Sequence, residues 1–181
     1  MSNGDVVKSK RRLIIKIMIP VLIILAIAGI WIFKYVQDHN LPSNNGNPDF
    51  ALNITEKIDL EKLKSYGLPI IIDFGSDSCI PCKEMAPVLE ELNKTLRGKA
   101  IIRFADVWKY PDLANGFPLE VIPTQILIDA TSKPFVPEDA QAMEIQMYSS
   151  RDTNEHVFTA HQGGMTKEQM LAVLKEMGLK E

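Results

Sequence analysis

Apolar residues follow three different patterns along this chain of 181 residues. Residues 17–33 form an apolar run without a single charge, which is long enough to suggest a membrane-spanning helix. Residues 70–72 are three isoleucines, a β-branched run typical of a buried strand. Apolar residues then recur at helical spacing, at Met85, Leu89, Leu92 and Leu96. The chain therefore combines an apolar N-terminal segment with a region that mixes strands and helices.

Strand and helix patterns alternate through that second region. Strands are predicted at 50–55, around 70–72, and at 100–107, 121–129, 143–148 and 156–160. Helices are predicted after the N-cap residue Asp59 to about Tyr66, from residue 80 to Gly98, as a short turn at 111–115, and from Thr166, where Gln169 completes a capping box. Such alternation is typical of an α/β fold, with a sheet covered on both faces.

The N-terminal region has the features of a signal anchor. Residues 1–12 are polar and basic, and the apolar run begins at Leu13 if Lys16 reaches the membrane surface, so the anchor is predicted at 13–36. A cleaved signal peptide is the alternative, because Ala26-Ile27-Ala28 offers a small-x-small site, but the apolar run continues beyond it. The excess of basic residues before the run places residues 1–12 in the cytoplasm and the rest of the chain outside. Residues 37–49 are a polar linker, and 50–181 form the folded domain.

Charge is unevenly divided between these parts. Residues 1–40 contain six basic and two acidic residues, whereas residues 41–181 contain 14 basic and 21 acidic ones. A domain this acidic lacks the basic surface that binding to a phosphate backbone requires. Nucleic acid is therefore excluded as a partner.

Both cysteines, Cys79 and Cys82, lie in one Cys-x-x-Cys motif between the central strand and the following helix. The free N–H groups and the positive dipole end at the start of a helix lower the pKa of a cysteine placed there. A reactive thiol with a second thiol three residues further on can carry out thiol–disulfide exchange. Binding of a soft metal by the pair remains an alternative, although a zinc site needs four ligands and the three histidines are not spaced as ligands around the motif.

These residues resemble the thioredoxin superfamily. The resemblance rests on Asp73-Phe74 before the motif, Pro81 and Lys83 in and after it, Ala86-Pro87 on the helix, Ile122-Pro123-Thr124 downstream, and Gly163-Gly164 before the last helix. It covers about residues 50–177, with 130–155 forming a longer loop or hairpin than is usual in the family. The nearest subgroup that the chain resembles is the membrane-tethered extracytoplasmic thioredoxins of bacteria.

The resemblance implies a thioredoxin fold and a role for each residue of the site. Cys79 is the expected nucleophile, Cys82 resolves the mixed disulfide, and Asp73 is a buried acid that helps to deprotonate Cys82. From the residues alone, a partly exposed carboxylate at a strand end is an equal interpretation of Asp73. The resemblance makes the Ile122–Pro123 bond cis, with the Ile122 backbone binding a substrate chain by strand addition.

The chain also departs from the family pattern. Ser78 replaces the usual tryptophan before the first cysteine, and Ile80 replaces glycine at the second position of the motif. His161 is interpreted as a surface residue, with an approach to the active site from the Gly163-Gly164 loop as the alternative.

The sequence therefore predicts a single-span protein of a bacterial cell membrane that carries a thiol–disulfide oxidoreductase outside. Neither a cofactor nor a metal is required, because the two cysteines carry the electrons. Reduction is favoured because the motif, Cys-Ile-Pro-Cys, lacks the histidine of strongly oxidising relatives and because Asp73 matches the acid of thioredoxin. The expected substrates are exported proteins with disulfides. The expected electron donor is a transmembrane thiol carrier of the cytochrome-c-biogenesis type. An oxidase or isomerase, a metal-binding module and a tethered adaptor that docks a partner through 130–155 are the alternatives.

Overall fold

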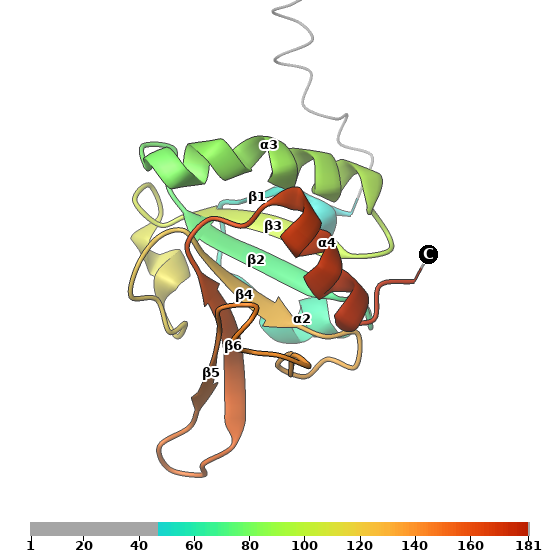
Figure 1. Cartoon of the computed structure of the whole chain (residues 1–181). Coiled ribbons are helices and arrows are strands. Elements are labelled where there is room, and N and C mark those ends of the chain that lie inside the picture. Colours follow the sequence, from blue (N-terminus) through green and yellow to red (C-terminus); the bar gives the residue numbers. More distant parts are fainter. Residues whose placement is uncertain (1–46, 181) are drawn as a thin grey trace, which may run out of the picture. The chain divides into compact units, whose positions relative to one another are not determined.

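The computed structural model describes residues 47–180, in which six strands form one mixed sheet (Figure 1). The strands are β1 (Asn53–Ile54), β2 (Ile70–Gly75), β3 (Ile101–Asp106), β4 (Thr124–Ile128), β5 (Ile145–Ser149) and β6 (His156–Gln162). Their order in the sheet is β1-β3-β2-β4-β6-β5. The β1–β3 and β2–β3 pairs are parallel, and the β2–β4, β4–β6 and β5–β6 pairs are antiparallel. This is the α/β sheet that the sequence predicts.

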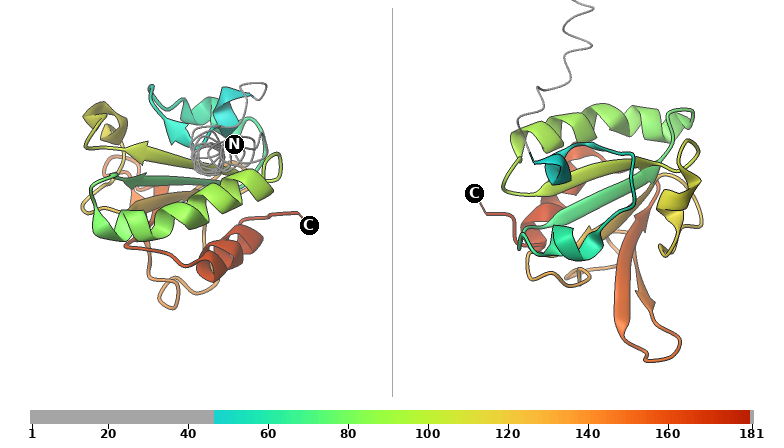
Figure 2. Two further views of the ribbon diagram at one scale, coloured as in Figure 1. Left: turned by 90° about the horizontal axis from the view of Figure 1, so that it is seen from above. Right: turned by 180° about the vertical axis from the view of Figure 1, so that it is seen from behind.

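Helices cover both faces of the sheet. On one face lie α3 (Ile80–Thr95) and α4 (Lys167–Glu176), and on the other lie α2 (Leu60–Lys64) and the 3₁₀ helix η2 (Pro111–Ala114) (Figure 2). Each face of the sheet has its own hydrophobic core. Side chains on both faces of the central strands are therefore buried, which explains why these strands are nearly continuous apolar runs. Ile71 and Leu127 pack with residues of α3 and α4, whereas Ile70 and Ile72 pack with Leu63 of α2.

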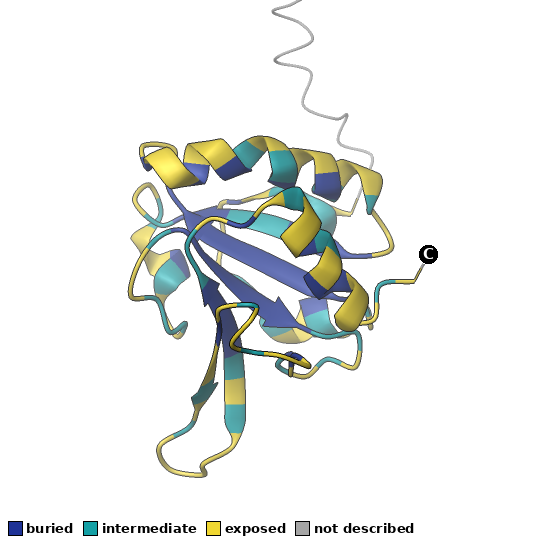
Figure 3. Cartoon of the chain, viewed as in Figure 1, coloured by how far each residue is buried: buried dark blue, intermediate teal, exposed yellow. Residues whose placement is uncertain are grey.

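The central strand β2 is buried along its whole length (Figure 3). It lies between β3 and β4 and has helices on both faces, so neither its apolar residues nor its one acidic residue, Asp73, meets solvent. A parallel strand covered on both faces is normally a continuous apolar run. A carboxylate in that position therefore stands out.

The helix starts agree with the sequence prediction. Asp59 caps α2 by accepting a hydrogen bond from the Lys62 N–H group at 3.0 Å. Thr166 and Gln169 form the predicted capping box of α4. The N-cap residue of α3 is Cys79, so the cysteine motif forms the beginning of this helix.

Two regions differ in detail from the prediction. The expected strand at 50–55 is reduced to Asn53–Ile54, because a 3₁₀ helix, η1 (Pro48–Phe50), occupies its start. The Asn47 side chain caps this helix by accepting from the Asp49 N–H group at 3.0 Å. The predicted hairpin exists as β5 and β6, and its tip extends beyond the rest of the sheet (Figure 1).

Residues 1–12, the predicted anchor at 13–36 and nearly all of the predicted linker at 37–49 lie outside the described residues. Within residues 47–180, no helix is both long and apolar enough to cross a membrane.

Candidate active site

The cysteine pair lies where β2 passes into α3. A disulfide joins Cys79 and Cys82, whose Cα atoms are 5.3 Å apart. The Cys82 N–H group points at the Cys79 sulfur at 3.3 Å, so the N-cap interaction of the helix is made by sulfur. In the reduced protein, the same N–H group and the positive end of the helix dipole would stabilise a thiolate on Cys79.

The two cysteines differ in their surroundings. Cys79 is 9% exposed and follows a surface loop, whereas Cys82 is 3% exposed and packs over the end of β2. A Cβ atom added to Gly75 would lie 3.1 Å from the Cys82 sulfur and 2.9 Å from the Phe104 ring. The absence of a side chain at Gly75 therefore lets Cys82 lie directly on the sheet.

Hydrogen bonds hold the loop between β2 and the first cysteine. Asp106, at the end of β3, accepts from the Asp77 N–H group at 3.1 Å, and also from the N–H groups of Trp108 and Lys109 at 3.0 and 2.9 Å. Burial alone would raise the pKa of Asp106, but these backbone donors together hold it below its ordinary value. An ionised Asp106 thus joins the active-site loop to the loop after β3.

The second loop of the site contains the predicted proline. The Ile122–Pro123 bond is cis, as predicted, and the Ile122 carbonyl oxygen lies 4.0 Å from the Cys79 sulfur. The Thr124 hydroxyl donates to the Val121 carbonyl at 2.7 Å and closes this turn. The structure therefore brings Ile122 beside the outer cysteine.

Asp73 is fully buried on β2, two residues before Gly75. The interpretation as a partly exposed strand-end carboxylate is therefore wrong. Burial raises the pKa of Asp73 to about 7, and a hydrogen bond from the Gln125 side chain, at 2.7 Å, acts in the opposite direction. The second oxygen of Asp73, Oδ2, has no hydrogen-bond partner among residues 47–180. A carboxyl group with this pKa can both accept and release a proton near neutral pH.

His161 is not a surface residue, and that interpretation is wrong. It is 3% exposed, and its Nδ1 lies 2.8 Å from Oε1 of Gln125, the residue that donates to Asp73. Gln125 itself was not identified from the sequence. A signal was present: Gln125 is an amide directly before the apolar run 126–128, within a segment whose pattern predicts a buried strand.

The described residues contain no group of three or more His, Cys, Asp or Glu side chains that could hold a metal ion.

Comparison with known proteins finds the following similarities. The thioredoxin family profile matches residues 54–149. Thioredoxin of Rickettsia bellii is 30% identical over 77 residues, which are 42% of this chain and 73% of that protein. Chloroplastic thioredoxin Y2 of Arabidopsis thaliana is 38% identical over 65 residues, which are 36% of this chain and 39% of that protein. The crystal structure of chloroplastic thioredoxin z aligns with a TM-score of 0.43 and 23% identity, over 68% of this chain and 93% of that one.

The fold and the buried cysteine pair at a helix start define a thioredoxin-like redox protein. The chain belongs to the thioredoxin family. Its homologues indicate the activity of a thiol–disulfide oxidoreductase.

Proposed function

We propose that this protein is a membrane-tethered reductase that acts on disulfides of exported proteins, with Cys79 as nucleophile and Cys82 as resolving cysteine. The observation that carries the proposal is the asymmetry of the pair. Cys79 caps α3 and is the outer sulfur, whereas Cys82 is buried over the strand that contains Asp73. This arrangement separates a thiol that meets the substrate from a thiol that needs an internal base.

The reaction has two exchange steps. The Cys79 thiolate attacks one sulfur of a substrate disulfide, the substrate S–S bond breaks, and the other substrate sulfur leaves as a thiolate that takes a proton from water. Cys82 then gives its proton to Asp73 and attacks the Cys79 sulfur, which breaks the bond to the substrate. The second substrate sulfur leaves as a thiolate that takes a proton from water, and Asp73 returns its proton to solvent before the next turnover. The substrate gains two electrons, and the protein leaves as the Cys79–Cys82 disulfide that the structure contains.

The substrate contact fits an extended polypeptide. The Ile122 backbone lies beside Cys79, where it can pair with a substrate chain in the manner of an added strand. Exposed apolar side chains lie on the neighbouring segments: Ile80 at the start of α3, Trp108 after β3, and Val121 before the cis proline. Such a surface favours unfolded or flexible proteins, whose apolar side chains are accessible.

Reduction is the proposed direction for two reasons. The residues between the cysteines are Ile80 and Pro81, with no histidine to stabilise the reduced pair as strongly as in oxidising relatives. The buried Asp73 supplies a base for Cys82, which a reductase needs at every turnover. After each turnover the disulfide must be reduced again, and a transmembrane dithiol carrier is the proposed electron donor.

The experiment that tests this function compares the wild-type chain with Cys79→Ser and Cys82→Ser. With dithiothreitol as donor, the wild type is expected to reduce an oxidised protein such as insulin, and Cys79→Ser to lose at least about a thousandfold in rate. Cys82→Ser should instead trap a mixed disulfide with the substrate. A wild-type protein that reduces no protein disulfide would contradict the proposal.

The direction of electron transfer and the location of the domain need separate measurements. A reduction potential for the pair near about −270 mV supports a reductase, whereas one near about −120 mV would identify a disulfide donor instead. For location, a membrane-impermeant maleimide should label Cys79 in intact, reductant-treated cells that express the full chain. Labelling only after lysis would contradict an extracytoplasmic domain.

A further inference from the structure

Three polar side chains form a row across the buried face of the sheet. Asp73 on β2 lies opposite Gln125 on β4, and Gln125 lies opposite His161 on β6. The Gln125 Nε2 group donates to Asp73 Oδ1 at 2.7 Å, and Gln125 Oε1 lies 2.8 Å from His161 Nδ1. All three residues are at most 3% exposed.

Apolar groups enclose this row on the side of the helices. The sulfur of Met85, on α3, lies 3.8 Å from Gln125 Nε2 and accepts the Met165 N–H group at 3.3 Å. Across the sheet, Phe104 pairs with Asp73 at one end of the row, and Ile145 pairs with His161 at the other. Water therefore has little access to these polar groups, and they depend on one another for hydrogen bonds.

The direction of each hydrogen bond follows from the chemistry of the groups. An ionised carboxylate only accepts, so the Gln125 amide must turn its NH₂ group toward Asp73. The amide oxygen then faces His161, and Nδ1 of His161 must carry the hydrogen of this contact. The His161 donor therefore adds a second interaction that holds the amide in the orientation that the carboxylate itself favours.

We propose that His161 and Gln125 are positioning residues that act on Asp73: the Nδ1–H group of His161 fixes the Gln125 amide, and the amide supports the ionised form of Asp73 that accepts the Cys82 proton. This rests on the proposed function, because it assigns Asp73 the role of base. It also explains why two polar residues are buried where the sheet could hold apolar ones.

The electrostatics agree with this geometry. Burial raises the pKa of Asp73, and the Gln125 hydrogen bond opposes that effect, so the pair of influences leaves it at about 7. Burial lowers the pKa of His161, against smaller opposing effects of Glu144, which precedes β5, and of the Gly163 backbone. Burial therefore favours the neutral form of His161, and a neutral imidazole with hydrogen on Nδ1 leaves Nε2 without one.

The first test uses the unmodified full-length chain. Nitrogen-15 NMR of the oxidised protein at pH 7.5 should show His161 with hydrogen on Nδ1, the less common form of a free imidazole. A spectrum with hydrogen on Nε2 alone would overturn the proposal. This measurement needs no variant and does not depend on whether the protein reduces any substrate.

The second test follows the carbon-13 signal of the Asp73 carboxyl group in the oxidised protein, where no thiol titrates. Gln125→Met removes the amide but keeps the length of the side chain, and the midpoint should rise by about one pH unit or more, as expected for the loss of a hydrogen bond to a charged group. His161→Leu should raise it by a smaller amount. His161→Asn can place an amide N–H where Nδ1–H lies, and it should restore the wild-type midpoint.

A matched control is available on the same strand. His156 is part-buried on β6 and bonds to the Thr159 hydroxyl and the Phe158 carbonyl, away from Gln125. His156→Asn should leave the Asp73 titration unchanged. If it shifts the midpoint as much as His161→Leu does, or if Gln125→Met leaves the midpoint at the wild-type value, the positioning role is wrong.

The pH profile of activity links the row to the reaction. In single-turnover reduction of a peptide disulfide, Gln125→Met should move the rise in rate toward higher pH by the same interval as the Asp73 midpoint. A uniform loss of rate at every pH would indicate a merely structural role and overturn the proposal. An inactive wild type would contradict the proposed function, while the tautomer and the titration would still test the positioning of Asp73.

Discussion

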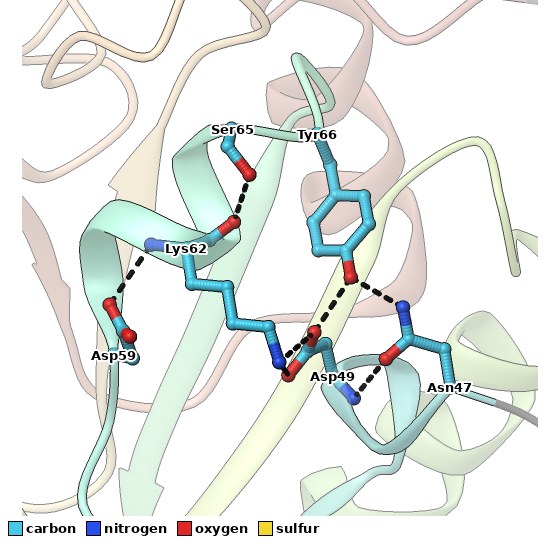
Figure 4. A network of polar contacts seen from close by, with 6 residues as sticks. All are labelled: Asn47, Asp49, Asp59, Lys62, Ser65 and Tyr66. Atoms are coloured by element: carbon cyan, nitrogen blue, oxygen red, sulfur yellow. Dashed lines mark hydrogen bonds and ion pairs between the residues drawn. The ribbon is translucent and has the colours of Figure 1, made fainter.

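Two carboxylates of this protein are buried in opposite ways. Asp73 lies on the central strand, and in the described part of the chain its side chain has one amide donor and no cation as hydrogen-bond partners. Asp49 lies in η1, where Lys62 and Tyr66 of the α2 region both bond to it, at 2.8 Å and 2.6 Å (Figure 4). Asn47 bonds to the Tyr66 hydroxyl and to the Asp49 backbone, and so completes the network. Within residues 47–180, both oxygens of Asp49 thus have hydrogen-bond partners, whereas Oδ2 of Asp73 has none.

The difference separates a structural carboxylate from a reactive one. The Lys62 hydrogen bond, and after it that of Tyr66, lowers the pKa of Asp49, whereas burial raises the pKa of Asp73. Asp49 is therefore ionised at neutral pH and joins η1 to α2. Near neutral pH, Asp73 is partly protonated and partly ionised, and the ionised form lowers the stability of the folded protein. A fold that retains such a cost indicates that the group has a function.

The largest expected effect comes from removing the charge of Asp73. Its pKa is higher in the folded protein than its ordinary value of 3.8, so its contribution to stability is full below about pH 4 and is lost as pH rises through about 7. Asp73→Asn should therefore raise the free energy of unfolding of the oxidised protein at pH 8 by about 3–5 kcal/mol. Urea unfolding of the full chain at pH 8 and at pH 4 measures this, and the two proteins should be nearly equal at pH 4.

The same variant should be a poorer enzyme. Without a base behind Cys82, mixed disulfides are expected to persist, and the turnover rate at pH 7 should fall by about ten- to a hundredfold. A variant that gains no stability at pH 8 would show that Asp73 is solvated like an ordinary carboxylate. The comparison with Asp49 would then have no physical basis.

Asp49→Asn should lower the stability of the folded protein, in contrast to Asp73→Asn, and by a smaller amount. The folded protein lowers the pKa of Asp49, so its contribution to stability is present above its ordinary pKa and is lost as pH falls through the lower folded value. At pH 7 the melting temperature should drop by roughly 5 °C, and disulfide reduction should be unchanged. Calorimetry at pH 7 and near pH 2.5 tests this prediction, since the difference between variant and wild type should shrink in acid.

Tyr66→Phe separates the hydroxyl contact from the charge. The Tyr66 hydroxyl donates to Asp49, and the ring packs edge-on against Phe50 with centroids 5.1 Å apart. Phenylalanine keeps the packing and loses both hydrogen bonds of the hydroxyl, the one to Asp49 and the one from Asn47, so the free energy of unfolding should fall by about 1–2 kcal/mol. If Tyr66→Phe costs as much as Asp49→Asn, the carboxylate depends on the hydroxyl rather than on Lys62.

Local patterns predicted most of what surrounds these two carboxylates. Each of these patterns is formed by residues that are near one another in the sequence, so it can be recognised there directly. Examples are the isoleucine run of β2, the helical spacing in α3 and the Thr166–Gln169 capping box. Asp73 is selected through the resemblance to the thioredoxin superfamily, because from the residues alone a partly exposed carboxylate at a strand end is an equal interpretation. Cys79 and Cys82 could be selected because their spacing is itself the signal.

The row behind the cysteines could not be predicted in the same way. Gln125 and His161 are 36 positions apart and meet because β4 and β6 pair in one particular register. A shift of that register by one residue would turn His161 to the opposite face of the sheet. Its burial therefore depends on tertiary pairing, which is why the interpretation as a surface residue was wrong. The Asn47 side chain that caps η1 likewise bonds to Tyr66, 19 positions away.

Lys62→Met should have the smallest effect of the series. The Lys62 side chain is 53% exposed, so its ion pair with Asp49 is open to water and ions. Exposed pairs contribute little and are screened by salt, and Asp49 would keep its bond from Tyr66. The melting temperature should change by at most about 2 °C in low salt and by less in 0.5 M NaCl, with the rate of disulfide reduction unchanged. A drop in melting temperature as large as that of Asp49→Asn, persisting in high salt, would mean that the Lys62–Asp49 pair is as well shielded from water as Asp73. Asp49 and Asp73 would then differ only in that Asp49 has a cationic partner.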